Sequence, residues 1–338
     1  MGFTLFTGII GFFVSFLVTF IGVSWWINVG SKLGFMSRDM NKPGEVYAVN
    51  AGGVWVSVGA SFGVLTIIAF HRHVFNEDFY LAEYMALSLL LFMASFLGFL
   101  DDILGWKKGL RVWQRVIFMA PLALPLVVIK AGVTTVAIPF LGRVDLGLLY
   151  PLVLVPIGVL GASNAYNMLA GYNGLEATLG IILFSSAAIY AYMKGITVAV
   201  SVSLVMLAAL IAFLLYNKYP AKVFPGNSMT YGVGAYYAST VILGNFEKFG
   251  VFLFTLYFIE FLLFIRGLKN HVYKENFGKP RPDGTLDEPY DKVYSLTHLA
   301  IKIQKKIRGK ATEKGVVATI SIMQLIVAIL AFLIAPIV

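Results

Sequence analysis

Long apolar runs separated by short polar segments recur along the whole chain of 338 residues. A helix of about 20 apolar residues crosses the hydrocarbon core of a bilayer, and runs of somewhat different length cross with a tilt or a local change in bilayer thickness. Ten runs meet this description, although the fifth and eighth are short: 3–27, 51–70, 80–100, 112–131, 148–163, 175–193, 196–216, 232–246, 250–266 and 315–336. The pattern predicts an all-α integral membrane protein with about ten transmembrane helices, in which residues 1–338 form a single polytopic membrane domain.

Two segments between the runs predict structure of their own. β-branched residues alternate along 132–147, which predicts a short β-hairpin on the outer surface. Residues 267–314 are numerous enough to form a cytoplasmic loop insertion between the last two spans. Within this insertion, 293–308 predicts a basic amphipathic helix at the membrane surface, with Ile301, Ile303 and Ile307 facing lipid.

Composition supports a membrane protein, and charge orients it. Apolar residues make up 59% of the chain and charged residues 13%, whereas soluble domains carry about 25% charged residues. Cysteine is absent, which excludes disulfides, thiolate metal ligands and a cysteine nucleophile. If the N-terminus is outside, the inside segments hold 21 of the 26 Lys and Arg residues, so that side is cytoplasmic. We therefore expect a multi-pass protein of the cell membrane whose basic cytoplasmic face suits the lipid bilayer and anionic substrates, and no nucleic-acid partner.

Two adjacent acids, Asp101 and Asp102, follow the third apolar run directly. A carboxylate in hydrocarbon is costly, so acids at the edge of a span are candidates for function. Two neighbouring carboxylates do not both stay ionised without a cation close by, and Mg²⁺ is often held by one or two carboxylates plus substrate phosphates. The pair therefore indicates phosphate chemistry at a membrane surface. The alternative is a helix end whose acids pair with Lys107 and Lys108.

Other polar residues of interest fall in the same predicted cytoplasmic segments. Five such segments, from alternate helix ends, could converge on one pocket with two carboxylates, several amides and a ring of cations. Besides the acid pair, the candidates in these segments are Asn41, Lys42, Asn50, Lys108, Arg111, Asn167, Asn173, Phe224, Asn227, Lys279 and Arg281. Taken singly, the amides could instead be helix caps and turn formers, and the cations could be topological anchors.

Four strings carry a resemblance to a known family. They are Phe99–Trp106 with the double aspartate, Asn164–Glu176 with the pattern Asn-x-x-Asn-x-x-x-Gly-x-Asn-Gly, Tyr216–Gly226 and Arg38–Lys42. The chain resembles the polyprenyl-phosphate N-acetylhexosamine-1-phosphate transferases, and among them the archaeal and eukaryotic dolichyl-phosphate N-acetylglucosamine-phosphotransferases. The resemblance implies transfer of a sugar-1-phosphate from a UDP-sugar to polyprenyl or dolichyl phosphate, with release of UMP. This would be the first step of lipid-linked oligosaccharide synthesis for N-glycosylation.

The resemblance also implies roles for single residues. Catalytic roles fall to Asp101, Asp102 and Arg111, and Mg²⁺, with Mn²⁺ as an alternative, would be held by Asn167, Asn227 and Asp101. Asn173 resembles the residue that reads the uracil, with Phe224 near the same base, and Arg281 resembles a phosphate contact. The remaining substrate contacts would be Lys108, Lys279, Asn50, Asn41 and Lys42. A homodimer is a further expectation.

Two residues depart from the family pattern. Asn227 stands where the family has an aspartate that binds Mg²⁺, and Asn50 stands where it usually has a glutamate. An amide oxygen coordinates a hard cation but brings no charge, so metal affinity should fall. A catalytically impaired homologue therefore stays an alternative, as does a secondary transporter of an anionic substrate. Transporters place polar groups near the bilayer midplane, often within internal repeats, whereas here these groups sit at span ends on one side.

Overall fold

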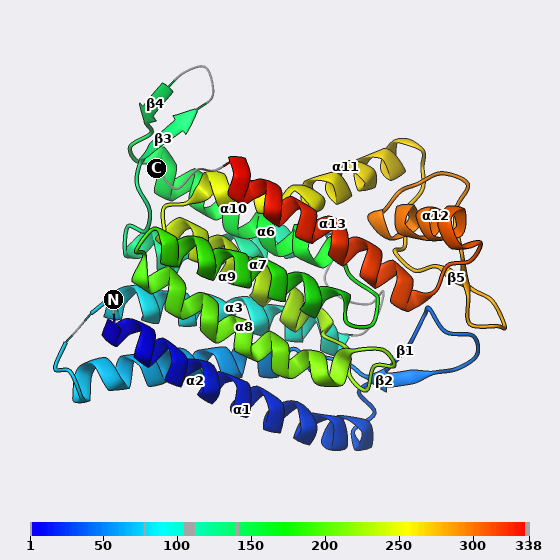
Figure 1. Ribbon diagram of the computed structural model, residues 1–338, viewed down its shortest axis with the longest axis horizontal. Coiled ribbons are helices and arrows are strands. Elements are labelled where there is room, and N and C mark those ends of the chain that lie inside the picture. The colour runs from blue at the N-terminus through cyan, green and yellow to red at the C-terminus, as the bar shows by residue number, and fades with distance from the viewer. Residues whose placement is uncertain (1, 78, 105–111, 139–141, 335–338) are drawn as a thin grey trace.

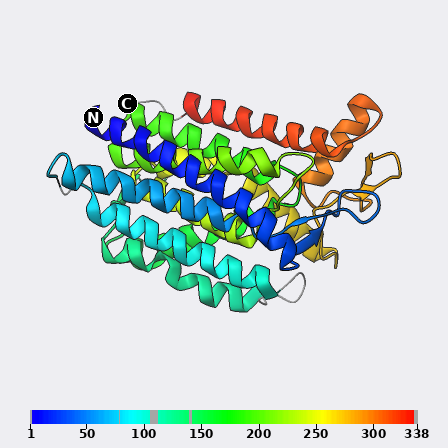
Figure 2. The same cartoon turned by 90° about the horizontal axis from the view of Figure 1, so that it is seen from below.

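The computed structural model describes residues 2–77, 79–104, 112–138 and 142–334. It is a bundle of helices that run back and forth along the long axis of the molecule (Figures 1 and 2). In chain order the helical elements are α1 (Gly2–Lys32), α2 (Val54–His73), α3 (Leu81–Leu104), α4 (Val112–Met119), the 3₁₀ turn η1 (Ala120–Ala123), α5 (Leu124–Val128), the π-helical turn η2 (Tyr150–Leu154), α6 (Val155–Met168), α7 (Leu175–Met193), α8 (Thr197–Asn217), α9 (Gly226–Leu243), α10 (Glu247–Leu253), α11 (Thr255–Lys269), α12 (Leu296–Arg308) and α13 (Glu313–Ile334). Each of the ten predicted runs overlaps one or more of these helices.

Only some of these helices qualify as membrane spans by their own length and composition. In the described ranges six do so, namely α1, α2, α3, α7, α8 and α13. A seventh results if α10 and α11, which meet at a bend of 54°, are one broken span. The chain is therefore a multi-pass membrane protein, and the count of ten spans stays a prediction.

Helix α9 lies in the middle of the bundle and is enclosed by other helices. None of its residues is exposed, and it packs against α3, α6 and α8. Its Gly, Ser and Thr residues let neighbouring backbones approach closely. At Gly234 of α9, for example, a Cβ would lie 2.5 Å from the carbonyl oxygen of Ala162 in α6. The large exposed apolar side chains lie instead on peripheral helices such as α1 and α13, including Phe13, Ile21 and Leu333.

The two ends of the bundle carry different extramembrane elements (Figure 1). One end holds the hairpins β1 (Met36–Arg38)–β2 (Tyr47–Val49) and β5 (Lys279–Pro280)–β6 (Leu286–Asp287), together with α12, and the opposite end holds β3 (Thr135–Ile138)–β4 (Gly142–Asp145). The hairpin predicted in 132–147 is confirmed as β3–β4, with Thr135 opposite Asp145. The structure therefore separates this hairpin from the segment 267–314, as the predicted topology requires.

The helix predicted in 293–308 exists as α12, but Ile301 does not face lipid. Ile301 is fully buried, and α12 packs against α13. On the polar side, Lys305 forms ion pairs with Asp287 and Glu288. The amphipathic pattern was correct, whereas the prediction about lipid was wrong for Ile301, because another part of the protein covers it. Ile303 is half-buried and Ile307 is exposed, so for these two residues contact with lipid stays a prediction.

Candidate active site

The acid pair at the end of α3 faces the start of α9. Asp102 accepts hydrogen bonds from the backbone N–H of Asn227 at 2.7 Å and from that of Ser228 at 3.0 Å. N–H groups in the first turn of a helix have no partner within the helix. Asp102 therefore caps α9 from a different helix, and its charge suits the positive end of the helix dipole.

Glycine is required where α9 begins. Gly226 has a φ of +66°, in the left-handed region that disfavours other residues. A Cβ on Gly226 would lie 2.3 Å from Oδ2 of Asp102. The absence of a side chain at Gly226 therefore lets the carboxylate of Asp102 approach the first turn of α9.

Asp101 is buried, with 3% of its surface exposed. Its Oδ2 accepts hydrogen bonds from Nδ2 of Asn227 at 2.9 Å and from the hydroxyl of Tyr231 at 3.2 Å, and it lies 3.4 Å from Nε of Arg115. A buried carboxylate needs such partners, since burial without them is costly. Sequence reasoning missed Tyr231 and Arg115, although Tyr231 lies four residues after Asn227 and so shares its helix face.

The alternative in which the acids pair with Lys107 and Lys108 falls outside the described residues. The same holds for Arg111. The described contacts of the pair are those to α9 and to Arg115.

Asn167, in the last turn of α6, joins the same group through α9. Its Oδ1 accepts a hydrogen bond from the hydroxyl of Thr230 at 2.8 Å, and Thr230 is three residues after Asn227 on one face of α9. The ends of α3, α6 and α9 thus gather two carboxylates and two side-chain amides.

The donor set at the ends of α3, α6 and α9 suits some metal ions and not others. In the described parts of the chain, no group of three or more His, Cys, Asp or Glu side chains could hold a metal. Carboxylate and amide oxygens are nevertheless the kind of ligand that Mg²⁺ and Ca²⁺ take. The residues therefore fit a hard cation if amide oxygens complete a set that begins with Asp101 and Asp102.

Asn173 belongs to a second network, between α6 and α7. Its Nδ2 donates to Asp39 at 2.9 Å, and its backbone N–H donates to Glu313 at 2.8 Å. Lys42 forms ion pairs with both of these acids. Glu313, at the start of α13, was missed, although its position beside the last apolar run is the signal that pointed to the acid pair.

Asn41 ties the loop after α6 to the segment after α11. It is 2% exposed, and its Nδ2 donates to the carbonyl of Gly171 at 2.8 Å. Its Oδ1 accepts a hydrogen bond from the backbone N–H of Gly278 at 3.0 Å. Asn41 therefore joins two segments that are more than 100 residues apart in the sequence.

Asn50 and Phe224 lie close together, because backbone hydrogen bonds join Phe224 to the residues on either side of Asn50. The N–H of Phe224 donates to the carbonyl of Val49 at 2.7 Å. The carbonyl of Asn50 accepts a hydrogen bond from the indole N–H of Trp26 at 2.8 Å. Both candidates are partly buried at the end of the bundle that carries β1 and β2.

Lys279 and Arg281 lie at the β5–β6 hairpin. Arg281 pairs with Asp287, and this hydrogen-bonded guanidinium holds the pKa of the Asp287 carboxyl below its usual value. Lys279 lines an open hollow of about 470 Å³ together with Tyr290. In the described part of the chain, neither cation makes a hydrogen bond or ion pair with the acid pair.

Comparison with known proteins gives the following similarities. A family model described as glycosyl transferase family 4 matches residues 84–245, a range that contains the acid pair, Asn167, Asn173 and Asn227. A protein of Saccharolobus solfataricus, provisionally named as a UDP-N-acetylglucosamine–dolichyl-phosphate N-acetylglucosaminephosphotransferase, is 33% identical over 323 residues, which cover 94% of each chain. The Dictyostelium discoideum protein of the same name is 31% identical over 271 residues, which are 69% of this chain and 65% of that one. A phospho-N-acetylmuramoyl-pentapeptide-transferase of Listeria monocytogenes is 29% identical over 262 residues, which are 74% of this chain and 79% of that one.

Proposed function

We propose that this chain, which belongs to the polyprenyl-phosphate N-acetylhexosamine-1-phosphate transferases, transfers N-acetylglucosamine-1-phosphate from UDP-N-acetylglucosamine to a polyprenyl phosphate of the dolichyl type. The observation that carries the proposal is the 33% identity to the Saccharolobus solfataricus protein over 94% of both chains. An oxygen of the lipid phosphate attacks the phosphorus that bears the sugar. The bond from this phosphorus to the bridging oxygen breaks, UMP leaves, and a lipid-linked pyrophosphoryl sugar remains. This product would begin lipid-linked oligosaccharide synthesis for N-glycosylation.

Two anionic substrates must meet in this reaction, so positioning and positive charge supply most of the catalysis. We propose that Mg²⁺, or alternatively Mn²⁺, is held by Asp101 and Asp102 with the amide oxygens of Asn167 and Asn227. When bound, the ion would offset the negative charge of the phosphates. A lipid phosphate is already ionised at neutral pH, so the chain needs no separate general base. Arg115, whose Nε lies 3.4 Å from Asp101, offsets the charge of this carboxylate.

The donor substrate would be bound by residues at the same end of the bundle. We propose that Asn173 and Phe224 bind the uracil, while Lys108, Arg111, Lys279 and Arg281 contact phosphates and Asn41, Lys42 and Asn50 complete the site. Support comes from the single hydrogen-bonded network that contains Asn173 and Lys42. We propose that the active site lies on the cytoplasmic face of the cell membrane, and the excess of Lys and Arg in the segments predicted to lie on that side supports this. The homodimer stays a prediction, which the mass of the purified protein in detergent would test.

The transporter alternative fits the arrangement less well. The polar networks join the last or first turns of α3, α6, α9 and α13, all at one end of the bundle, rather than broken helices at its middle. The impaired-homologue alternative rests on Asn227, whose amide donates to Asp101 where the family has a third acid.

One assay separates these possibilities. Protein purified in detergent should release UMP when UDP-N-acetylglucosamine, polyprenyl phosphate and Mg²⁺ are all present, and removal of the lipid or of Mg²⁺ should stop the release. Uptake of an anionic substrate into vesicles without UMP release would support a transporter. The absence of both activities would support an impaired homologue.

A further inference from the structure

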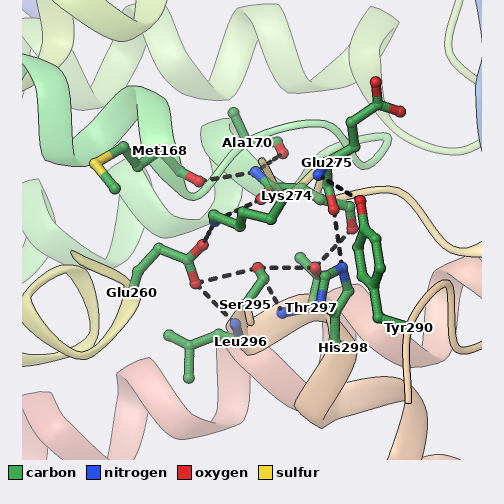
Figure 3. A network of polar contacts seen from close by, with 11 residues as sticks. Met168, Ala170, Glu260, Lys274, Glu275, Tyr290, Ser295, Leu296, Thr297 and His298 are labelled. Carbon is green, nitrogen blue, oxygen red and sulfur yellow. Dashed lines mark hydrogen bonds and ion pairs between the residues drawn. The ribbon is translucent and has the colours of Figure 1, made fainter. Parts of the chain in front are cut away.

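A buried ion pair lies where the segment after α11 meets the bundle (Figure 3). Glu260 of α11 is fully buried, and its Oε1 pairs with Lys274, whose side chain is 5% exposed. The second carboxylate oxygen accepts hydrogen bonds from the hydroxyl of Ser295 at 3.1 Å and from the N–H of Leu296 at 2.7 Å. Glu260 thus ties both ends of the segment 274–296 to α11.

Lys274 in turn orients Asn276. Its Nζ donates to Oδ1 of Asn276 at 2.7 Å, so the amide nitrogen of Asn276 points the other way. This nitrogen donates to the carbonyls of Met168 and Ala170, both at 2.8 Å. The hydroxyl of Thr297 donates to the backbone carbonyl of Asn276 at 2.7 Å, and this hydrogen bond holds the backbone of Asn276 in place.

The two carbonyls flank the end of α6. Met168 is the last residue of that helix and follows Asn167 directly, and the chain leaves the helical conformation at Leu169, where φ is −103° and ψ is 61°. The last carbonyls of a helix have no partner within it. Asn276 therefore supplies hydrogen bonds on both sides of the point where the helix stops. Asn41, which joins Gly171 to Gly278, is a second tie between the same two segments.

We propose that Asn276, held by the Lys274–Glu260 ion pair, is a positioning residue that fixes the end of α6 and thereby the side chain of Asn167 in the active site. The proposal rests on the proposed function, because Asn167 matters to catalysis only if this site transfers a phosphoryl group. Residues that orient ligands without touching substrate typically change metal affinity or activity by about 10–100-fold when they are replaced.

Asn276→Asp isolates this role. The aspartate keeps the size of the side chain and an acceptor for Lys274, but it has no hydrogens for the carbonyls of Met168 and Ala170. Asn270→Asp is the matched control, because this exposed amide lies just after α11 and, among the residues that the structure describes, its side chain donates to the carbonyl of Arg266 alone, at 2.8 Å. Replacing Glu260 or Lys274 is less informative, since breaking a buried pair leaves an uncompensated charge and can prevent folding.

Two measurements read out the positions of the α6 end and of Asn167. We expect Asn276→Asp to raise the Mg²⁺ concentration for half-maximal UMP release about tenfold or more, while KM for polyprenyl phosphate stays unchanged. Hydrogen exchange at the amides of residues 167–171 should become faster in Asn276→Asp, because the local opening of this loop costs less free energy. Asn270→Asp should match the wild type in both measurements.

Two outcomes would overturn the proposal. In the first, Asn276→Asp keeps the wild-type Mg²⁺ dependence and the wild-type exchange rates. In the second, every kinetic parameter falls in proportion to a lower melting temperature, as expected for a purely structural role. If the wild type itself releases no UMP, the proposed function fails, and the hydrogen-exchange comparison alone decides whether Asn276 positions the end of α6.

Discussion

Replacing Asn227 by aspartate would add a third carboxylate to the acid pair. In the structure the amide of Asn227 donates to Oδ2 of Asp101 over 2.9 Å. An ionised aspartate has no hydrogen to donate, so this contact becomes a repulsion between like charges. Two unit charges about 4 Å apart interact by about 4 kcal/mol at an effective dielectric constant near 20. A bound cation would gain a term of the same order, and even a third of it corresponds to about a tenfold change in an equilibrium constant.

The expected effects of Asn227→Asp on stability and on activity both depend on Mg²⁺. In EDTA the variant should unfold at a lower temperature than the wild type, because three carboxylates repel each other. With Mg²⁺ this difference should shrink, and the Mg²⁺ concentration for half-maximal UMP release should fall about tenfold. Thermal unfolding in detergent and titration of UMP release against Mg²⁺ measure the two effects.

Asn28→Asp provides the control for Asn227→Asp. It adds the same charge near the end of α1 at the same end of the bundle, where the exposed amide donates, within the described ranges, to the carbonyl of Ser24 alone. This control should change neither measurement. A flat Mg²⁺ dependence in Asn227→Asp would refute the reasoning and would remove Asn227 from the metal site, leaving Asn167 with Asp101 or Asp102.

Other perturbations of the site and the topology have equally direct readouts. Asp101→Asn and Asp102→Asn should each abolish UMP release from protein that remains folded and membrane-inserted, and near-normal rates in both would contradict a role for the pair. Gly226→Ala should lower the unfolding temperature and the rate, because its Cβ would meet Asp102 and a left-handed conformation costs about 1–2 kcal/mol; an unchanged unfolding temperature would count against the close approach. A cysteine at Lys279 should react with an impermeant reagent only from the cytoplasmic side, and one at Arg143 only from outside. Because the native chain has no cysteine, all labelling comes from the introduced residue. Reaction of both cysteines from the same side would contradict the topology.

The helices were predictable because their signal is local. Length and hydropathy are properties of consecutive residues, and every predicted run overlaps helix in the structure. The start of α9 was placed at 232 instead of Gly226, because its first turn is polar and is enclosed by α3 rather than by lipid. The bend between α10 and α11 was not predicted, because no Pro or Gly lies at the break to mark it in the sequence.

The site was predictable in part, because one physical rule marks its acids. The cost of a carboxylate in hydrocarbon singled out Asp101 and Asp102 at the edge of a run. The same rule applies with greater force to Glu260, inside the run 250–266, and to Glu313 beside the last run, and both proved to be buried and paired. Their partners could not be predicted, since no local pattern links Glu313 to Lys42, 271 residues away in the chain.

The central claim is that the chain joins N-acetylglucosamine-1-phosphate to a lipid phosphate, and the most direct test is mass spectrometry of the lipid product. Purified protein with UDP-N-acetylglucosamine, polyprenyl phosphate and Mg²⁺ should convert the lipid to a species heavier by one N-acetylglucosamine-1-phosphate unit, with one UMP released for each lipid converted. An unchanged lipid mass, with UDP-N-acetylglucosamine intact or hydrolysed without transfer, would contradict the account.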